Sequence, residues 1–258
     1  MKLHKQTLQA GAALALVGTL AGASISSADI TDNAPALHDA MIFGTSAGAD
    51  TGNASGMGPG MFAGADGMSN RKRSLVTFDL SGVPANATVV SATMHLVLGQ
   101  IAGSGGGSSP GTYPDRTLSV WHMTRTWSEG TSGSPTSTSI GGSGQGYTRV
   151  TGDSSWSYAN YSSVLWTTAG GDHASTALAA ITFHQPFSNG QILSWGTTAM
   201  RDEVRNWLTT PSGYHGWEIT SNLEASPTSF LGFWTKDGAS ANHNTALAPV
   251  LEIHYTTP

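Results

Sequence analysis

Short stretches in which apolar and polar residues alternate dominate this chain. The clearest example is 74–80, and a second one, 88–98, follows it after a turn that contains Pro84. Alternation with a period of two is typical of strands with one buried and one solvated face, and the proline turn joins these two as a hairpin. Further strands are expected at 117–124, 179–184, 216–220, 230–235 and 250–255. The pattern predicts an all-β protein.

One segment has helical periodicity instead. Within 198–208 the residues Met200, Val204 and Trp207 fall on one helical face, and Pro211 follows as a terminator. Many short strands with a single crossover helix are typical of a jelly-roll β-sandwich. We therefore expect a jelly-roll β-sandwich with one short helix at about 198–208.

Two segments are predicted to be loops, because they are almost entirely small and polar. These are 102–111 and 130–146, which contain mainly Gly, Ser, Thr and Pro. Neither part of the chain that flanks these loops looks able to fold as a domain of its own. We therefore interpret 29–258 as a single domain with long loops. A linker between two domains at 130–146 is the alternative.

The first 28 residues are predicted to be a secretory signal peptide. Lys2 and Lys5 give a basic start, an apolar run covers 10–23, and 26–28 fits a cleavage site before Asp29. The apolar run is too short for a comfortable transmembrane helix. We expect an extracellular or periplasmic protein without membrane insertion.

Composition narrows the classes of partner. The chain has no cysteine, only 10% of its residues are charged, and its net charge is −5. Packing or bound ions must therefore replace disulfides. Net negative charge gives no electrostatic reason to expect nucleic acid or an anionic membrane as partner.

Six ordered segments carry a resemblance to a known family. The hairpin at 73–98 is followed by a Trp-Ser-Glu-Gly-Thr turn ending at Thr131, and by further matching segments at 153–158, 165–172, 213–217 and 248–255. Together with the helix that carries Trp207, these segments resemble the DNRLRE-domain family of secreted β-sandwiches. The resemblance implies a β-jelly-roll, and some members of the family are carbohydrate-binding modules, including binders of acidic polysaccharides such as alginate.

Aromatic side chains are the candidate ligand-binding groups, because the C–H face of a sugar ring stacks on an aromatic face. We assign Trp127, Trp156, Trp166 and Trp207 to the core. Trp195 and Trp217 are expected to be partly exposed. The candidate binding residues are Trp195, Trp217, Trp234, Tyr147, Tyr158, Tyr161 and the basic Arg71, which could meet an acidic sugar.

Three acidic residues lie on predicted turns, namely Glu129, Asp153 and Asp172. They are candidate ligands of a structural Ca²⁺, which takes carboxylate and carbonyl oxygens from loops. The alternative is that they cap turns by accepting backbone N–H groups. A third interpretation pairs Glu129 with Asp153 or Asp172 as the two carboxylates of a glycosidase.

These observations favour a non-catalytic protein that binds an extracellular or cell-wall polysaccharide. We expect the loops at 102–115, 130–147 and 153–173 to form most of the binding surface. A self-assembling matrix or filament protein is the second hypothesis, since unpaired edge strands allow association. A polysaccharide-degrading enzyme is the third.

Overall fold

A computed structural model describes residues 29–102 and 114–258. The predicted signal peptide, 1–28, and most of the first predicted loop lie outside the described residues. The strands are β1 (Asp29–Gly44), β2 (Asp50–Ser55), β3 (Gly60–Ala65), β4 (Arg71–Phe78), β5 (Thr88–Ile101), β6 (Arg116–His122), β7 (Tyr147–Thr148), β8 (Tyr158–Asn160), β9 (Val164–Leu165), β10 (Ala179–Phe183), β11 (Ile192–Gly196), β12 (Trp217–Ser221), β13 (Leu231–Trp234) and β14 (Val250–Thr256). The helices are α1 (Thr198–Thr209) and α2 (Lys236–Ala241), and 3₁₀ turns cover Ile140–Ser143, Pro211–Gly213 and Thr245–Leu247.

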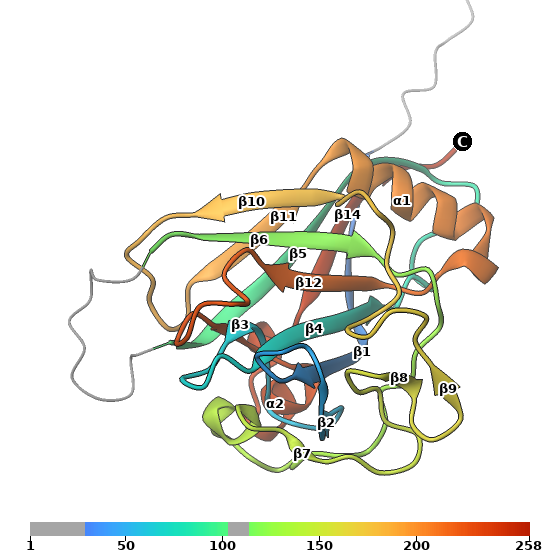
Figure 1. Ribbon diagram of the computed structural model, residues 1–258. Helices are drawn as coiled ribbons and strands as arrows, with labels where there is room; N and C mark the ends of the chain where they lie inside the picture. Colours follow the sequence, from blue (N-terminus) through green and yellow to red (C-terminus); the bar gives the residue numbers. More distant parts are fainter. Residues whose placement is uncertain (1–28, 103–113) are drawn as a thin grey trace, which may run out of the picture.

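The strands form an antiparallel β-sandwich with the jelly-roll-like character expected from the sequence. Figure 1 shows two layers, with β10, β6, β12 and β4 in one and β11, β5 and β14 in the other. On one side β3 and β13 connect the layers, because β3 pairs with β4 and β13 pairs with β5. All seven predicted strands overlap observed ones, and the predicted helix is confirmed as α1.

β1 connects the two layers on the other side. Its first part, from Asp29 to Pro35, pairs with β14, and its second part, from Ala36 to Gly44, pairs with β4. The register shifts between Ala36 and His38, where the strand passes from one layer to the other. Such an irregularity bends a strand and aims its side chains in new directions.

The main core fills the space between the layers. Phe62, Phe78, Phe233 and Leu251 are among its fully buried side chains. Helix α1 covers one end of this core with Met200, Val204 and Trp207, as its periodicity predicts. The helix begins at Thr197, whose side chain accepts a hydrogen bond from the backbone N–H of Met200.

A second, smaller core lies on the outer face of β1 and β4. Ala40, Ile42 and Leu75 are buried there beneath Trp156 and Trp166, which the covering segment between β7 and β10 supplies. The assignment of these two tryptophans to the core is confirmed. Since the second half of β1 is buried on both faces, its sequence lacks the simple alternation of a half-solvated strand.

The expectation that Trp195 and Trp217 are partly exposed is wrong. Both side chains have 0% exposure. Trp195 on β11 packs edge-on against Phe183 and Phe233, and Trp217 at the start of β12 lies against Phe78 and Trp207. Ser194 and Gly196 suggested a solvated position for Trp195, and the preceding Tyr214 and His215 suggested one for Trp217. Both tryptophans nevertheless lie on strands, with their rings in the core.

No helix among the described residues is long and apolar enough to cross a membrane.

We predict that Trp195→Ala lowers the free energy of unfolding by about 3–5 kcal/mol, because it leaves a large cavity between the layers. Ile192→Ala on the same strand is the matched control: Ile192 is 58% exposed, so its loss should change stability by about 0.5 kcal/mol or less. Urea unfolding of both variants checks this. Equal effects would contradict the position of Trp195 in the core.

Candidate functional site

An aromatic cavity opens at one end of the layer that contains β6, β12 and β4. It has a volume of about 200 Å³ and is lined by Leu37, His38, Thr77, Thr126, Trp127, Tyr214 and His215. We call it the aromatic cavity. Leu37 and His38 come from the bend in β1, and Thr77 lies opposite His38 on β4. The other lining residues flank β6 and β12, which pair with each other through His122 and Trp217.

Hydrogen bonds fix the two aromatic rings of this cavity. Trp127 Nε1 donates to the backbone O of His215 at 2.8 Å, and Thr126 Oγ1 lies 2.9 Å from His215 Nδ1. The Tyr214 hydroxyl donates to the Phe78 backbone O at 2.6 Å and also accepts from the Phe78 N–H. The rings are therefore held in place before any ligand arrives.

Behind the cavity, a row of tilted aromatic rings supports Tyr214. Its ring centroid lies 4.4 Å from that of Trp207, and the Trp207 ring lies 5.0 Å from that of Trp217. This row joins the cavity wall to the main core. Burial raises the pKa of Tyr214 above its ordinary value, so its hydroxyl stays protonated near neutral pH.

Aromatic, hydroxyl and imidazole groups make up most of the lining of the aromatic cavity. None of its lining residues is Asp, Glu, Lys or Arg. Burial, with a smaller contribution from nearby His122, lowers the pKa of His215 below its ordinary value and favours the neutral imidazole. Hydroxyl, imidazole and aromatic groups together suit a neutral ligand that carries hydroxyl groups.

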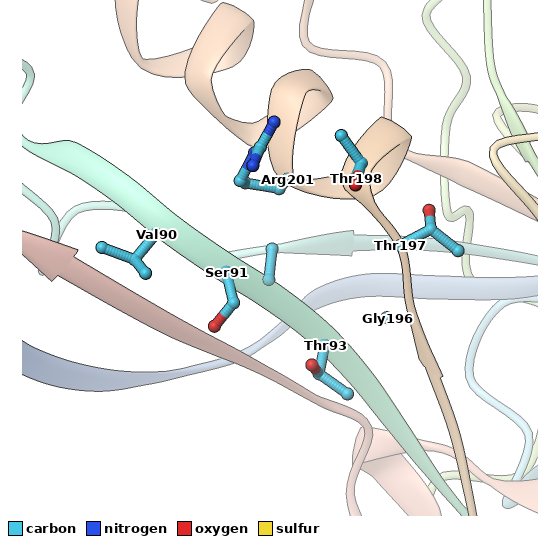
Figure 2. A pocket seen from close by; sticks show the side chains of 8 residues that line it. Val90, Ser91, Thr93, Gly196, Thr197, Thr198 and Arg201 are labelled. Atoms are coloured by element: carbon cyan, nitrogen blue, oxygen red, sulfur yellow. The ribbon is translucent and has the colours of Figure 1, made fainter.

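A second cavity, of about 230 Å³, lies where α1 begins beside β5. Figure 2 shows Arg201 and Thr198 on the helix, above Ser91 and Thr93 of the strand. Val90, Ala92, Gly196 and Thr197 complete its lining, which contains no aromatic residue. Arg201 already pairs with Asp202, Nε to Oδ1 at 2.9 Å. This cavity therefore lacks the stacking surface that the aromatic cavity provides.

The other predicted binding residues lie in several places. Tyr158 and Tyr161 meet edge to face with centroids 5.1 Å apart, and the Arg149 guanidinium lies 4.3 Å from the Tyr161 ring centroid. Tyr147 lies on β7, beside β2. Trp234 is half-buried at the end of β13, and Arg71 on β4 donates to the backbone O of Ser46. None of these residues lines the aromatic cavity.

Two of the predicted metal ligands cap turns. The Asp153 carboxylate accepts backbone N–H groups from Thr131, Ser132 and Val150. The Asp172 carboxylate accepts those of Thr167 and Thr168 and pairs with Arg125, Nε to Oδ2 at 2.6 Å. These contacts correspond to the turn-capping alternative.

Glu129 has different neighbours. One of its oxygens, Oε1, accepts the Asp39 N–H at 2.9 Å, and the other, Oε2, lies 3.1 Å from His38 Nδ1. Asp39 itself is completely buried, and burial raises its pKa to about 8. The three predicted ligands therefore do not gather, and Glu129 instead meets a carboxylate that the sequence analysis missed.

A buried acid lies under the covering segment, on the outer face of β12. Glu218 has 0% exposure, and neither of its carboxylate oxygens has a hydrogen-bond partner. Arg73 Nη1 lies 3.6 Å from Oε1, and His173 Nε2 lies 3.6 Å from Oε2. The Nε and Nη2 groups of Arg73 donate hydrogen bonds to Glu224 instead. Gly171, at φ +111°, lies directly over the acid. A Cβ atom at this position would lie only 2.7 Å from Glu218 Oε1, so a residue without a side chain is needed there. Burial, only partly offset by Arg73, raises the pKa of Glu218 to about 8.

Sequence reasoning missed the aromatic cavity for identifiable reasons. Trp127 was assigned to the core, yet it is only half-buried, with one part packed on the second core. His38 and His215 are isolated histidines in the sequence without ligand-like spacing. The one available signal was the Tyr-His-Gly-Trp segment at 214–217, whose Tyr214 and His215 both line the cavity.

The fold and this site together define a β-sandwich with a rigid aromatic cavity at one end, whose lining contains no Asp, Glu, Lys or Arg. No protein-family model matches the chain, and no curated protein matches it.

We predict that Glu218→Gln changes the pH dependence of stability. The pKa of a glutamate in the unfolded chain is near 4.5, whereas that of Glu218 is about 8, so folding takes up a proton between these values. The stability that Glu218 contributes to the wild type is present below pH 4.5 and is lost as the pH rises to 8. The loss in the free energy of unfolding is up to about 1.4 kcal/mol per pH unit. Glutamine does not titrate. The free energy of unfolding of the variant, measured with urea from pH 5 to 8, should therefore rise relative to that of the wild type.

Glu252→Gln serves as the control for this measurement, because Glu252 is a partly exposed residue on β14. Identical pH profiles for the wild type and Glu218→Gln would contradict the raised pKa of Glu218.

Proposed function

We propose that this protein is a non-catalytic glycan-binding β-sandwich and that the aromatic cavity is its sugar site. The observation that carries the proposal is the pair of fixed rings, Trp127 and Tyr214, in a cavity without charged residues. An aromatic face stacks on the C–H face of a pyranose, and nearby polar groups orient its hydroxyls. Thr77, Thr126 and the two imidazoles supply those polar groups.

The size and charge of the cavity specify the kind of glycan. Its volume of about 200 Å³ is below the roughly 300–1,000 Å³ typical of sites for drug-sized ligands, so it suits one sugar unit at a time. The neutral lining favours an uncharged sugar over a uronic acid. We therefore propose a neutral polysaccharide, which differs from the acidic ligands that some members of the DNRLRE-domain family bind.

The proposal also includes secretion of the protein and its membership of the DNRLRE-domain family. A signal peptide at 1–28 would export the chain to the cell surface or the medium, where polysaccharides are found. The six segments that resemble the DNRLRE-domain family support the same class of function. Asp153 and Asp172, whose carboxylates cap turns, are less available for a glycosidase reaction, which supports a binding protein over an enzyme.

Self-association is the second candidate, favoured by one observation. The β8–β9 hairpin carries Val164 and Leu165, which are 38% and 57% exposed. Exposed apolar side chains on a short two-stranded sheet offer a surface on which a second copy could pack. Growth of large particles with concentration, measured by light scattering, would support this candidate.

We predict that Trp127→Ala weakens glycan binding at least about tenfold, since it removes the stacking face. The protein expressed as residues 29–258 is first screened on a glycan array that contains neutral and acidic polysaccharides. Affinity for the best ligand is then measured by calorimetry for the wild type and the variant.

Tyr161→Ala is the matched control, because it removes an aromatic ring from the alternative surface beside Arg149. Loss of binding in Tyr161→Ala but not in Trp127→Ala would move the site to that surface. Absence of binding to every glycan would contradict the proposed function.

A further inference from the structure

Three carboxylates from distant parts of the chain converge below the bend in β1. They belong to Asp39 on β1, Glu129 in the turn after β6 and Asp237 in the first turn of α2, and one oxygen from each lies within 4.8 Å of the others. We call these three residues the carboxylate cluster. Backbone groups hold two of them in position, because Glu129 accepts the N–H of Asp39 and Asp39 accepts that of Lys236.

One side-chain cation lies at the cluster, but it reaches only two of the three acids. Lys236 Nζ lies 2.7 Å from Glu129 Oε1 and 3.1 Å from Asp237 Oδ2. Asp39 Oδ1 is buried without a hydrogen-bond partner, and the whole Asp39 side chain has 0% exposure. Lys236 therefore pairs with the two outer acids and leaves the inner one with a buried oxygen that has no hydrogen-bond partner.

We propose that the carboxylate cluster is a Ca²⁺ site, in which Asp39, Glu129 and Asp237 are ligands and Lys236 is the group that the ion displaces. All the ligand atoms are carboxylate oxygens, the donors that hard cations prefer. Two oxygens bound to one Ca²⁺ at roughly 2.3–2.6 Å each lie at most about 5 Å apart, which accommodates the observed spacing. Mg²⁺ demands near-ideal octahedral geometry and loses its waters reluctantly, so carboxylates that backbone contacts hold in position suit it less well than Ca²⁺.

The lysine can leave without disrupting the fold. The Lys236 side chain is 26% exposed, and its long aliphatic part allows the ammonium to turn toward solvent. Its backbone N–H keeps the hydrogen bond to Asp39 Oδ2 whichever way the side chain points. Displacement therefore exchanges an ammonium that satisfies two carboxylates for a divalent ion that satisfies three.

The Ca²⁺ site adjoins the aromatic cavity but does not depend on the proposed sugar binding. His38 lines that cavity, and its Nδ1 lies 3.1 Å from Glu129 Oε2. A bound ion would fix Glu129 and with it the orientation of the imidazole. Binding of the ion itself is measured on the protein alone, so it can be confirmed even where no glycan binds.

The test is calorimetric titration of the chelator-treated protein with CaCl₂, together with its thermal unfolding at each Ca²⁺ concentration. We expect one saturable site with a dissociation constant on the order of 10⁻⁴–10⁻³ M, as in extracellular calcium modules, and a rising melting temperature. Lys236→Met should tighten Ca²⁺ binding severalfold, because the competing ammonium is gone. Asp237→Asn should weaken it at least tenfold.

Asp202→Asn is the matched control, since Asp202 is also a helix carboxylate paired with basic side chains, and its loss should leave Ca²⁺ affinity unchanged. A second readout is acetylation of Lys236 by an amine-reactive ester, followed by mass spectrometry, which Ca²⁺ should increase. Absence of saturable binding in both the wild type and Lys236→Met would overturn the proposal. Equal affinity for Mg²⁺, or Ca²⁺ binding unaffected by Asp237→Asn, would overturn it as well.

Discussion

The passage of β1 from one layer to the other is the constraint on which the rest of the structure depends. A strand that pairs first with β14 and then with β4 satisfies backbone groups of both layers and closes the sandwich on this side. The bend that makes this passage also positions His38 and Asp39. The aromatic cavity and the carboxylate cluster therefore both derive from one irregularity in pairing, and they share the contact between His38 and Glu129.

Buried ion pairs and tryptophans hold the layers and the covering segment together in a chain that contains no cysteine. On β4, Lys72 points to one face and pairs with Asp66 at 3.1 Å, while Arg73 points to the other and pairs with Glu224. Arg73 also donates to the backbone O of Gly170 and lies under the Trp156 ring, so it ties the covering segment to the sheet. Removal of one partner from such a pair leaves an uncompensated buried charge, which makes these contacts strongly interdependent.

Regular elements with one buried face were the most predictable from the sequence, whereas the bent, doubly buried β1 and the short α2 were missed. The alternation in β14 and the helical face of α1 each reflect a single boundary between core and solvent. β1 lacks this signal, since its second half is buried on both sides, and α2 is too short to show periodicity. The family-like segments identified Trp156 and Trp166 as core residues, but nothing local distinguishes a buried Trp195 from an exposed one.

The same limit applies to the candidate site. Glu129 could be selected as an acidic residue on a turn, yet its neighbours Asp39 and Asp237 lie 90 and 108 positions away along the chain. Only the closure of the sandwich brings such residues together. Lone histidines such as His38 and His215 acquire a role in the same way, from the strands that happen to end beside them.

The position of β14 between β1 and β5 has a consequence for the order of folding. The first described strand, β1, pairs with the last one, β14, and the paired residues lie more than two hundred positions apart in the sequence. Contacts of such high sequence separation form late, because the loop entropy must be overcome before the strands can pair. During synthesis the first half of β1 and the paired part of β5 therefore stay without this partner until the last strand has been made, which leaves their edges open to wrong pairing for most of that time.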